Sequence, residues 1–409
     1  MNRTASKRLI GAAIVAVVLI AAVIFGQQAY RLWKVTTIFA PEKIVNNFRS
    51  MPSIFDAHEI ARAGKQTAWA EESKALPVQF TFAGKEVAID EWLTRTGTTG
   101  LAVIHNDKLA YERYFQGYQP QSQAIAWSVS KSFVSALAGI AIAEGAIKSV
   151  RDPVTLYVPA LKGSGYDGVA LEDVLEMSSG VAFNEDYADP KADINQLGEV
   201  LAYGRSVNDW VAALKQRDRA GGTQHHYISV DTQVIGMVIE AVTGKSLSDY
   251  FAEKLWSRIG PECDAHWLAD GQGNELAFGG LTLCLRDFAK LGQLYLHNGK
   301  NAAGEQVVPA QWVQASVHPH KAHLLPGRAV EEGQPILGYG YQWWIPQSSE
   351  GEYMAVGVYG QFVYVNPARN VVIAKTSAYA NYNEDGIRME YESLEGFRSI
   401  ARQFTKRGE

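Results

Sequence analysis

Strand-forming and helix-forming stretches are segregated along this chain. β-prone residues flank the turn-rich tetrapeptide at 105–108, which predicts a β-hairpin near residues 101–111. Alternating apolar residues predict further strands at 353–365 and 371–375, and a closing helix is expected at 390–404. Helical periodicity dominates the region in between. This order predicts an α+β domain, in which N- and C-terminal segments share one antiparallel sheet and a helical region is inserted between them.

The N-terminal segment has the pattern of a membrane helix. Residues 9–25 carry no charge, and Arg3, Lys7 and Arg8 precede them. The run is at the short end of what spans a bilayer, and cations before it favour a cytoplasmic N terminus. A cleaved signal peptide is the alternative, although no clean small-x-small site follows. We expect residues 1–34 to be a single-pass anchor in a bacterial inner membrane, with the remainder on the periplasmic or extracellular side.

The bulk composition indicates a globular protein with a large core. Of the 409 residues, 47% are hydrophobic and 20% are charged, and the formal net charge is −5. Because there is no basic excess to hold a phosphate backbone, nucleic acid is not an expected partner. After the anchor, we expect a lead-in segment at residues 35–97 that packs on a main domain at residues 98–409.

Ser128 and Lys131 form the only pair in the chain in which a lysine follows a serine by three residues. An apolar helix is predicted from residue 128 to residue 143, so this spacing places both side chains on one helix face. A serine hydroxyl becomes a useful nucleophile when a nearby base, such as a neutral lysine, takes its proton. Amides at a helix start, that of Ser128 included, also stabilise an oxyanion. A solvated helix start is the alternative interpretation.

A tyrosine followed two residues later by serine or asparagine would supply a second proton carrier. The stretches with this spelling begin at Tyr227, Tyr364, Tyr379 and Tyr391. Tyr227 follows a glycine-rich loop and precedes a predicted helix, whereas the others lie in or after a strand or within the closing helix. We therefore select Tyr227, with Ser229 two residues on. Whether Lys131 or Tyr227 is the base depends on pKa shifts that the sequence does not reveal.

These motifs, with their surroundings, resemble those of serine hydrolases related to class C β-lactamases and penicillin-binding proteins, and within them the 6-aminohexanoate-dimer hydrolase and esterase branch. The resemblance extends from about residue 98 to residue 404. The stretches that carry it are WSVSKSF at 127–133, DPV at 152–154, YVP at 157–159, LEDVLEMSSG at 171–180, GGL at 279–281, RD at 286–287, GYGYQWW at 338–344 and GVYGQ at 357–361. It implies a β-lactamase/transpeptidase-like fold. We expect no cofactor and no metal.

The third motif of that family is Lys/His-Thr-Gly on an edge strand, and the amide that follows it completes an oxyanion hole. The best match here is residues 355–357, so the resemblance implies that the amide of Val358 acts beside that of Ser128. The motif's cation is missing. Residues 375–377 spell it better, but they fall one strand too late and lack the glycine. A neutral ester or linear amide is therefore favoured over a β-lactam.

Several residues are candidates for contact with the substrate. The loop at 184–190 resembles one that lines the cleft in the nylon-oligomer hydrolase branch, and Tyr187 lies in it. For Glu185 and its acidic neighbours, a solvated loop that caps the next helix is the alternative. For Trp343, the alternative is a place in the core. The candidate substrate-binding residues are Tyr187, Ser229, Gly357 and Trp343.

The chain has two cysteines, Cys263 and Cys284. In an oxidising compartment they can pair and close a short loop. Two separate buried thiols are the alternative.

The function expected from these residues is a two-step acyl transfer. Ser128 attacks the carbonyl of a small ester or amide, Lys131 and Tyr227 carry its proton, and water releases the acyl-enzyme. The first alternative is a D,D-peptidase or β-lactamase-type penicillin-binding enzyme. The second is a catalytically silent binding module at the membrane surface.

Overall fold

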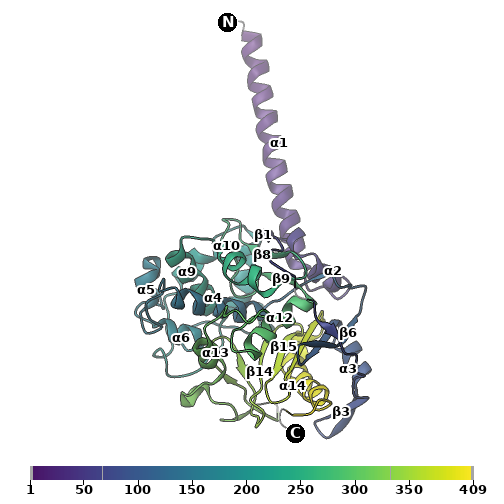
Figure 1. Cartoon of the computed structure of the whole chain (residues 1–409). Coiled ribbons are helices and arrows are strands. Elements are labelled where there is room, and N and C mark those ends of the chain that lie inside the picture. The colour runs from purple at the N-terminus through teal and green to yellow at the C-terminus, as the bar shows by residue number, and fades with distance from the viewer. Residues whose placement is uncertain (1–2, 67, 332, 407–409) are drawn as a thin grey trace.

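The computed structural model describes residues 3–66, 68–331 and 333–406. Helix α1 (Arg3–Thr36) stands away from the folded body, and the rest of the chain packs at its C-terminal end (Figure 1). Its part Ala13–Thr36 is long and apolar enough to cross a membrane, and an apolar stretch of 18 residues within it is not buried. A signal sequence has the same length and composition.

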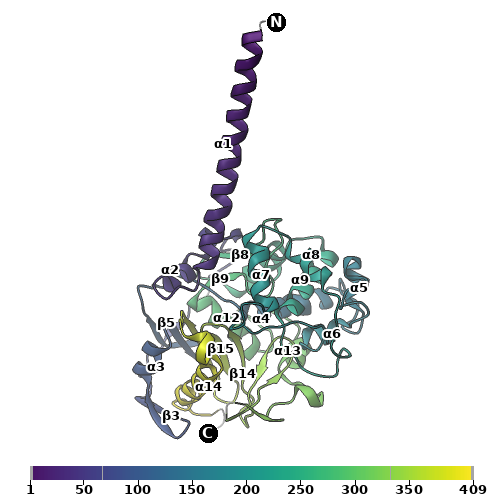
Figure 2. The ribbon, with the colours of Figure 1, turned by 180° about the vertical axis from the view of Figure 1, so that it is seen from behind.

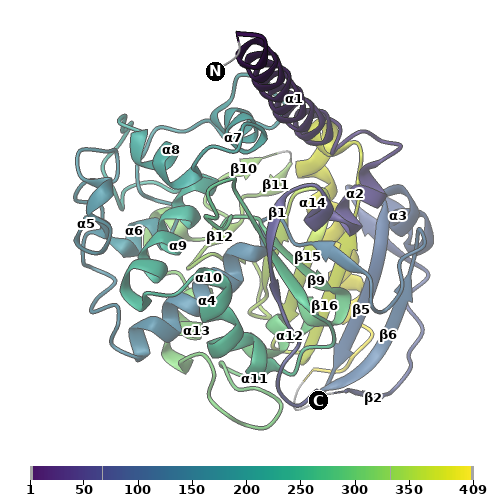
Figure 3. The same cartoon turned by 90° about the horizontal axis from the view of Figure 1, so that it is seen from above.

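The central sheet joins strands from the two ends of the body. The strand order is β12-β13-β14-β15-β16-β5-β6-β2, and β16 lies antiparallel to β5 (Figure 3). The short β2 pairs with β6 in parallel, and the other described strand pairs of this sheet are antiparallel. The N- and C-terminal segments thus share one sheet, as the sequence predicted. The strands are β2 (Ala70–Glu71), β5 (Thr98–His105), β6 (Lys108–Tyr114), β12 (Gly338–Tyr339), β13 (Trp344–Ile345), β14 (Tyr353–Gly357), β15 (Gln361–Asn366) and β16 (Val371–Ser377).

The predicted hairpin is confirmed. β5 and β6 pair in antiparallel register and are joined at Asn106 and Asp107, whose φ angles are +48° and +60°. Two central residues with positive φ define the turn that best matches the twist of a hairpin. Asn and Asp tolerate this conformation better than most residues do, so the local sequence fixes the turn.

Both faces of the sheet are covered by helices. Along β5, Ala102 and Ile104 belong to one core, while Leu101 and Val103 belong to the other. Helix α12 (Leu285–Leu296) packs across β5, β15 and β16 on the first face. Helices α3 (Ile89–Arg95) and α14 (Tyr382–Ala401) contribute to the core of the second face. Because successive strand residues alternate between faces, a sheet buried on both sides gives the apolar strands seen here.

Helices are the main regular structure between β6 and β14 in the described residues. Helix α4 (Val129–Ala143) is buried from Val129 to Ala141 and packs on α9 (Ser229–Thr243). Gly139 of α4 has no room for a Cβ, which would lie 2.4 Å from the ring of Trp312. The other helices of this region are α5 (Val154–Tyr157), η2 (Pro159–Leu161), α6 (Leu171–Leu175), α7 (Asp193–Ala202), α8 (Val207–Ala213), α10 (Leu247–Phe251), η3 (Ala252–Trp256), α11 (Ser257–Ile259), α13 (Ala310–Val317) and η4 (Ala322–Leu324).

The lead-in segment is built into the body. Its strand β1 (Asp56–Ile60) is the edge of a four-stranded sheet with the order β1-β8-β9-β7, and its strand β2 extends the central sheet. The remaining elements of the chain are α2 (Ile44–Arg49), η1 (Met51–Ser53), β3 (Gln79–Phe82), β4 (Lys85–Ala88), β7 (Gln123–Ile125), β8 (Ala265–Ala269), β9 (Leu281–Cys284), β10 (Val330–Glu331) and β11 (Gln334–Pro335).

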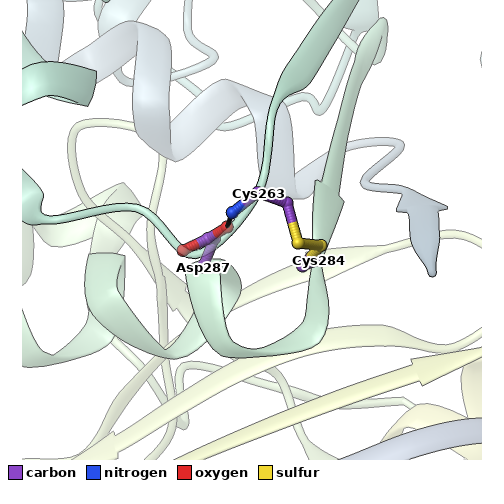
Figure 4. A group of neighbouring side chains, drawn as sticks. All are labelled: Cys263, Cys284 and Asp287. Atoms are coloured by element: carbon purple, nitrogen blue, oxygen red, sulfur yellow. Dashed lines mark hydrogen bonds between the residues drawn. A yellow bond between two sulfur atoms is a disulfide. The ribbon is translucent and has the colours of Figure 1, made fainter. Parts of the chain in front are cut away.

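Cys263 and Cys284 form a disulfide, which decides between the two alternatives left by the sequence (Figure 4). Their Cα atoms are 6.2 Å apart, and the bond closes a loop with a sequence separation of 21. Asp287 lies beside the disulfide and accepts hydrogen bonds from the amides of Glu262 (2.8 Å) and Cys263 (3.3 Å). Because the two sulfurs are bonded to each other, this cluster offers no thiolate to a metal.

Candidate active site

Ser128 is the N-cap residue of α4, at the end of a tight turn that follows β7. The residue before it, Trp127, has a φ of +44°, which is rare for a bulky side chain. The amide of Ala126 is bonded to the carbonyl of Leu281 at 2.8 Å, so the turn is held from the side of β9. Backbone strain of this kind persists where the surroundings enforce it, and it concentrates at functional sites.

Lys131 lies one helical turn beyond Ser128 and is almost fully buried, with 1% of its surface exposed. Its Nζ lies 2.7 Å from Ser128 Oγ, 3.1 Å from Ser229 Oγ and 2.8 Å from the carbonyl oxygen of Phe278. Burial lowers the pKa of Lys131 to about 7, although the charge of Glu185 acts against this shift. A neutral amine donates two protons, which Ser229 and Phe278 can accept, and its lone pair is then left for the proton of Ser128.

Tyr227 completes the expected group of three residues. Its ring lies 5.1 Å from Lys131 Nζ and stacks on Trp344 with ring centres 5.3 Å apart. Burial raises the pKa of the Tyr227 phenol well above its ordinary value, and a hydrogen bond with Ser128 offsets only part of that shift. The phenol therefore keeps its proton near neutral pH, whereas Lys131 can lose one.

The other tyrosines with the same spelling lie elsewhere and have other partners. The hydroxyl of Tyr364 donates to Glu352 (2.7 Å), and that of Tyr379 donates to Asp385 (2.7 Å). The hydroxyl of Tyr391 donates to the carbonyl oxygen of Pro335 (3.2 Å).

Glu185 is a site residue that the sequence did not single out. Its Oε1 accepts hydrogen bonds from the hydroxyls of Ser229 (2.5 Å) and Tyr187 (2.9 Å), and its Oε2 accepts one from the amide of Ser229 (2.8 Å). Burial raises the pKa of Glu185, and the charge of Lys131 lowers it. The solvated-loop alternative is therefore wrong for Glu185. Asp186 is exposed and accepts a hydrogen bond from the amide of Ala188 at 2.9 Å, within the loop itself.

Gly357 brings the end of β14 against the Ser128 turn. A Cβ at this position would lie 2.6 Å from the carbonyl oxygen of Ala126 and 3.2 Å from the amide nitrogen of Ser128. Within the described parts of the chain, the amides of Ser128 and Val358 donate no hydrogen bond to another protein group. Two backbone N–H donors beside a nucleophile can form an oxyanion hole.

A cavity of about 140 Å³ opens beside Ser128. Most of its walls are apolar, and among the described residues that line it there is no lysine, arginine or histidine. Its lining residues are Val35, Ile38, Phe39, Phe55, Trp127, Ser128, Tyr187, Ile194, Asn195, Leu197, Gly198, Leu201, Ser229, Phe278, Gly279, Val358 and Tyr359. The cavity therefore unites the candidates Tyr187, Ser229 and Val358 with the proposed nucleophile.

Trp343 and Lys375 are buried away from the cavity, whereas Trp344 reaches the site. Trp343 is fully buried and packs on Tyr295, with ring centres 4.5 Å apart, so our expectation that it binds substrate is corrected. Neighbouring residues of an extended chain point in opposite directions, and it is Trp344 that reaches Tyr227. Lys375 is also buried, between the rings of Trp92 and Phe362 in the second core, and therefore supplies no cation to the cavity.

Comparison with other sequences gives a consistent result. A family model described as Beta-lactamase matches residues 89–396. A 6-aminohexanoate-dimer hydrolase of Paenarthrobacter ureafaciens is 29% identical over 296 residues, which are 71% of this chain and 75% of the relative. A Beta-lactamase of Pseudomonas fluorescens is 28% identical over 170 residues, which are 39% of this chain and 43% of the relative.

Solved structures share the fold. The structure described as "Putative 6-aminohexanoate-dimer hydrolase from Bacillus anthracis" has a TM-score of 0.78 over 90% of this chain and 95% of that one, at 24% identity. EstCE1, described as a hydrolase with promiscuous acyltransferase activity, has a TM-score of 0.61 over 76% of this chain and 96% of that one, at 16% identity. At these identities the likeness concerns the fold alone.

Proposed function

The chain belongs to the beta-lactamase family and is a serine hydrolase related to 6-aminohexanoate-dimer hydrolase, and from this premise we propose that Ser128 forms an acyl-enzyme with a neutral ester or linear amide. The observation that carries the proposal is the 2.7 Å contact between Ser128 Oγ and the buried amine of Lys131. A lysine whose pKa is lowered to about 7 is a base matched to neutral pH.

In the proposed reaction, Ser128 Oγ forms a bond with the carbonyl carbon while its proton passes to the neutral amine of Lys131. The amides of Ser128 and Val358 hold the negative charge on the former carbonyl oxygen. The bond to the leaving group then breaks, and the leaving oxygen or nitrogen receives the proton through Tyr227. Water attacks the acyl-enzyme by the same route, and Ser128 regains its proton as the acid is released.

The walls of the cavity favour an uncharged substrate. No cation lines the cavity within the described residues, so a carboxylate on the substrate would find no partner there. The carboxylate of Glu185 accepts hydrogen bonds from the hydroxyls of Ser229 and Tyr187, so it interacts with residues of the site itself. An ester or a linear amide with an apolar group beside the carbonyl fits these surroundings.

We also propose that α1 remains attached and anchors the enzyme in a bacterial inner membrane, with the catalytic body on the periplasmic or extracellular side. Near the end of the apolar segment, Tyr30 and Trp33 are 57% and 51% exposed, and Lys34 and Lys43 lie over their rings at 4.8 and 4.5 Å. Exposed aromatic residues with nearby cations are typical of a membrane interface. The disulfide favours an oxidising compartment.

Contacts at the base of α1 support its retention in the mature enzyme. Arg31 forms an ion pair with Asp56 at 3.2 Å, and Lys34 Nζ donates to the carbonyl oxygen of Ser53 at 2.6 Å. Val35 lines the cavity itself. Removal of α1 would therefore remove Arg31, Lys34 and Val35, which contact the body or line its cavity.

The test compares the full chain with its Ser128→Ala variant on p-nitrophenyl acetate, a linear amide and a fluorescent penicillin. Hydrolysis of the ester is expected in the wild type and its loss in the variant. Ser130→Ala is the matched control, because Ser130 Oγ accepts a hydrogen bond from the amide of Leu281, whereas Lys131 Nζ donates to Ser128, Ser229 and Phe278. Undiminished ester turnover by Ser128→Ala would overturn the proposal, and covalent trapping by the penicillin would favour a penicillin-binding enzyme instead.

A further inference from the structure

The segment at residues 35–39, here called the collar, joins the end of α1 to the catalytic body and forms one wall of the cavity. Val35, Ile38 and Phe39 all line it. The ring of Phe39 stacks on Tyr359 with centres 4.7 Å apart and an angle of 10° between the planes. Its ring centre also lies 5.8 Å from the ring centre of Trp127. The collar therefore touches the residues that adjoin the two proposed oxyanion donors in the chain.

Another part of the wall comes from α7, which packs beside the base of α1 (Figure 2). Its residues Ile194, Leu197 and Leu201 present aliphatic side chains to the cavity. An apolar protein cavity of about 150 Å³ accepts benzene, so a cavity of about 140 Å³ has room for an apolar group of roughly six carbons.

Three polar side chains of the lining, those of Asn195, Tyr187 and Ser229, already form hydrogen bonds with protein groups. Asn195 Nδ2 donates to the carbonyl oxygens of Tyr187 (3.1 Å) and Asp189 (2.8 Å). The hydroxyls of Tyr187 and Ser229 both donate to Glu185. Because the remaining walls are mostly apolar, burial of a polar substrate group there would leave most of its hydrogen bonds unmade, whereas an apolar group loses none.

We propose that this cavity is an acyl-binding subsite, which takes an apolar acyl group of about six carbons attached to the scissile carbonyl. The inference rests on the proposed role of Ser128. Ser128 and Val358 lie on its wall, so the cavity adjoins the position of the scissile carbonyl. Its occupant is assigned as the acyl group, which stays with the enzyme after the leaving group departs. The collar places this subsite at the end of the body that faces the proposed membrane.

Gly198 of α7 permits a sharp test. It lines the cavity, and no heavy atom lies within 4 Å of a Cβ built at this position. The variant Gly198→Leu therefore adds a side chain without a clash at its first carbon. In the middle of a helix, the change from glycine also favours folding. Glu199→Leu is the matched control, because Glu199 is an exposed neighbour on the same helix and does not line the cavity.

The experiment measures kcat/KM of the full chain, held in phosphatidylcholine nanodiscs, for acetyl, butyryl, hexanoyl and octanoyl esters of p-nitrophenol. Since each buried methylene favours binding, wild-type kcat/KM is expected to rise by about tenfold or more from acetyl to hexanoyl. Gly198→Leu should reduce the hexanoyl-to-acetyl ratio by about tenfold through loss of that space. Phe39→Ala, which opens the collar wall, should reduce the same ratio, and Glu199→Leu should leave it unchanged.

A flat profile in the wild type would overturn the subsite. So would a ratio that survives in a folded Gly198→Leu enzyme, as judged by its circular dichroism and Tm. Failure of the proposed function is a different result, in which turnover of the acetyl ester does not depend on Ser128. If turnover depends on Ser128 while the profile is flat, the acyl subsite alone is refuted.

Discussion

Glu185 and Ser229 are joined by two hydrogen bonds, one from the backbone amide of Ser229 and one from its hydroxyl, at 2.8 and 2.5 Å. Because the hydroxyl proton is directed at the carboxylate, the oxygen of Ser229 is free to accept from Lys131 Nζ at 3.1 Å. The hydrogen bonds that link Glu185, Ser229, Lys131 and Ser128 thus orient the amine of Lys131, and the charge of Glu185 raises the pKa of that amine.

Glu185→Gln should shift the pH dependence of the enzyme. Lys131 must be neutral to accept a proton, so activity rises as pH passes its pKa, and the charge of Glu185 raises that pKa. Removal of the charge lowers the pKa, and the rising limb of kcat/KM against pH should move to lower pH. An unmoved limb, or one displaced to higher pH, would show that Glu185 does not act through Lys131.

Lys131→Met should lower kcat for ester hydrolysis by a factor on the order of 10² to 10⁴, the usual contribution of a general base. Lys375→Met is the matched control. Lys375 is also buried with its pKa lowered to about 7, but it donates to Ser377 Oγ at 2.5 Å and does not line the cavity. Steady-state kinetics should show the large loss only at position 131, and equal losses would contradict the assignment of Lys131.

Tyr227→Phe should separate amide from ester hydrolysis. The phenyl ring can keep the stacking on Trp344, so the change removes only the hydroxyl. A p-nitrophenolate leaves without help, whereas an amine must be protonated, so kcat for a linear amide should fall by about 10² or more and that for the activated ester by much less. Similar losses for both substrates would argue against a role as proton donor.

Gly357→Ala should impair the oxyanion site. The added carbon would lie 2.6 Å from the carbonyl oxygen of Ala126, so β14 or the Ser128 turn must move. The loss of one aligned donor typically costs about 10² to 10³ in kcat. We expect KM to change little by comparison. A variant with wild-type kcat would show that the amide of Val358 is not needed.

Loss of the disulfide should affect stability before activity. In a chain-entropy account, a loop of this length contributes about 3 kcal/mol to the free energy of unfolding. The double variant Cys263→Ser/Cys284→Ser should therefore unfold at lower denaturant concentration, while its ester hydrolysis under native conditions persists. Equal denaturation midpoints for variant and wild type would contradict this expectation.

The order of strands and helices was predictable because local patterns are strong there. The hairpin turn at Asn106 and Asp107 and the spacing of Ser128 and Lys131 follow from backbone preference and helical periodicity. Tyr227 could be chosen by its placement before a helix.

Other parts of the site depend on contacts between distant segments. An acidic loop normally indicates solvent exposure, so nothing local distinguishes Glu185 from its acidic neighbours. Trp343 and Trp344 are equally apolar, and only the register of the sheet decides which one reaches Tyr227. The collar has no periodicity, and its role as a cavity wall depends on where α1 meets the body.

The most direct test of the central claim is to locate the covalent adduct. The full chain is treated with a fluorophosphonate, digested and analysed by peptide mass spectrometry, with Ser128→Ala and Ser130→Ala treated in parallel. Our account predicts a single adduct on Ser128, unaltered by Ser130→Ala and absent from Ser128→Ala. An adduct on another residue, or one that persists when Ser128 is replaced, would contradict it.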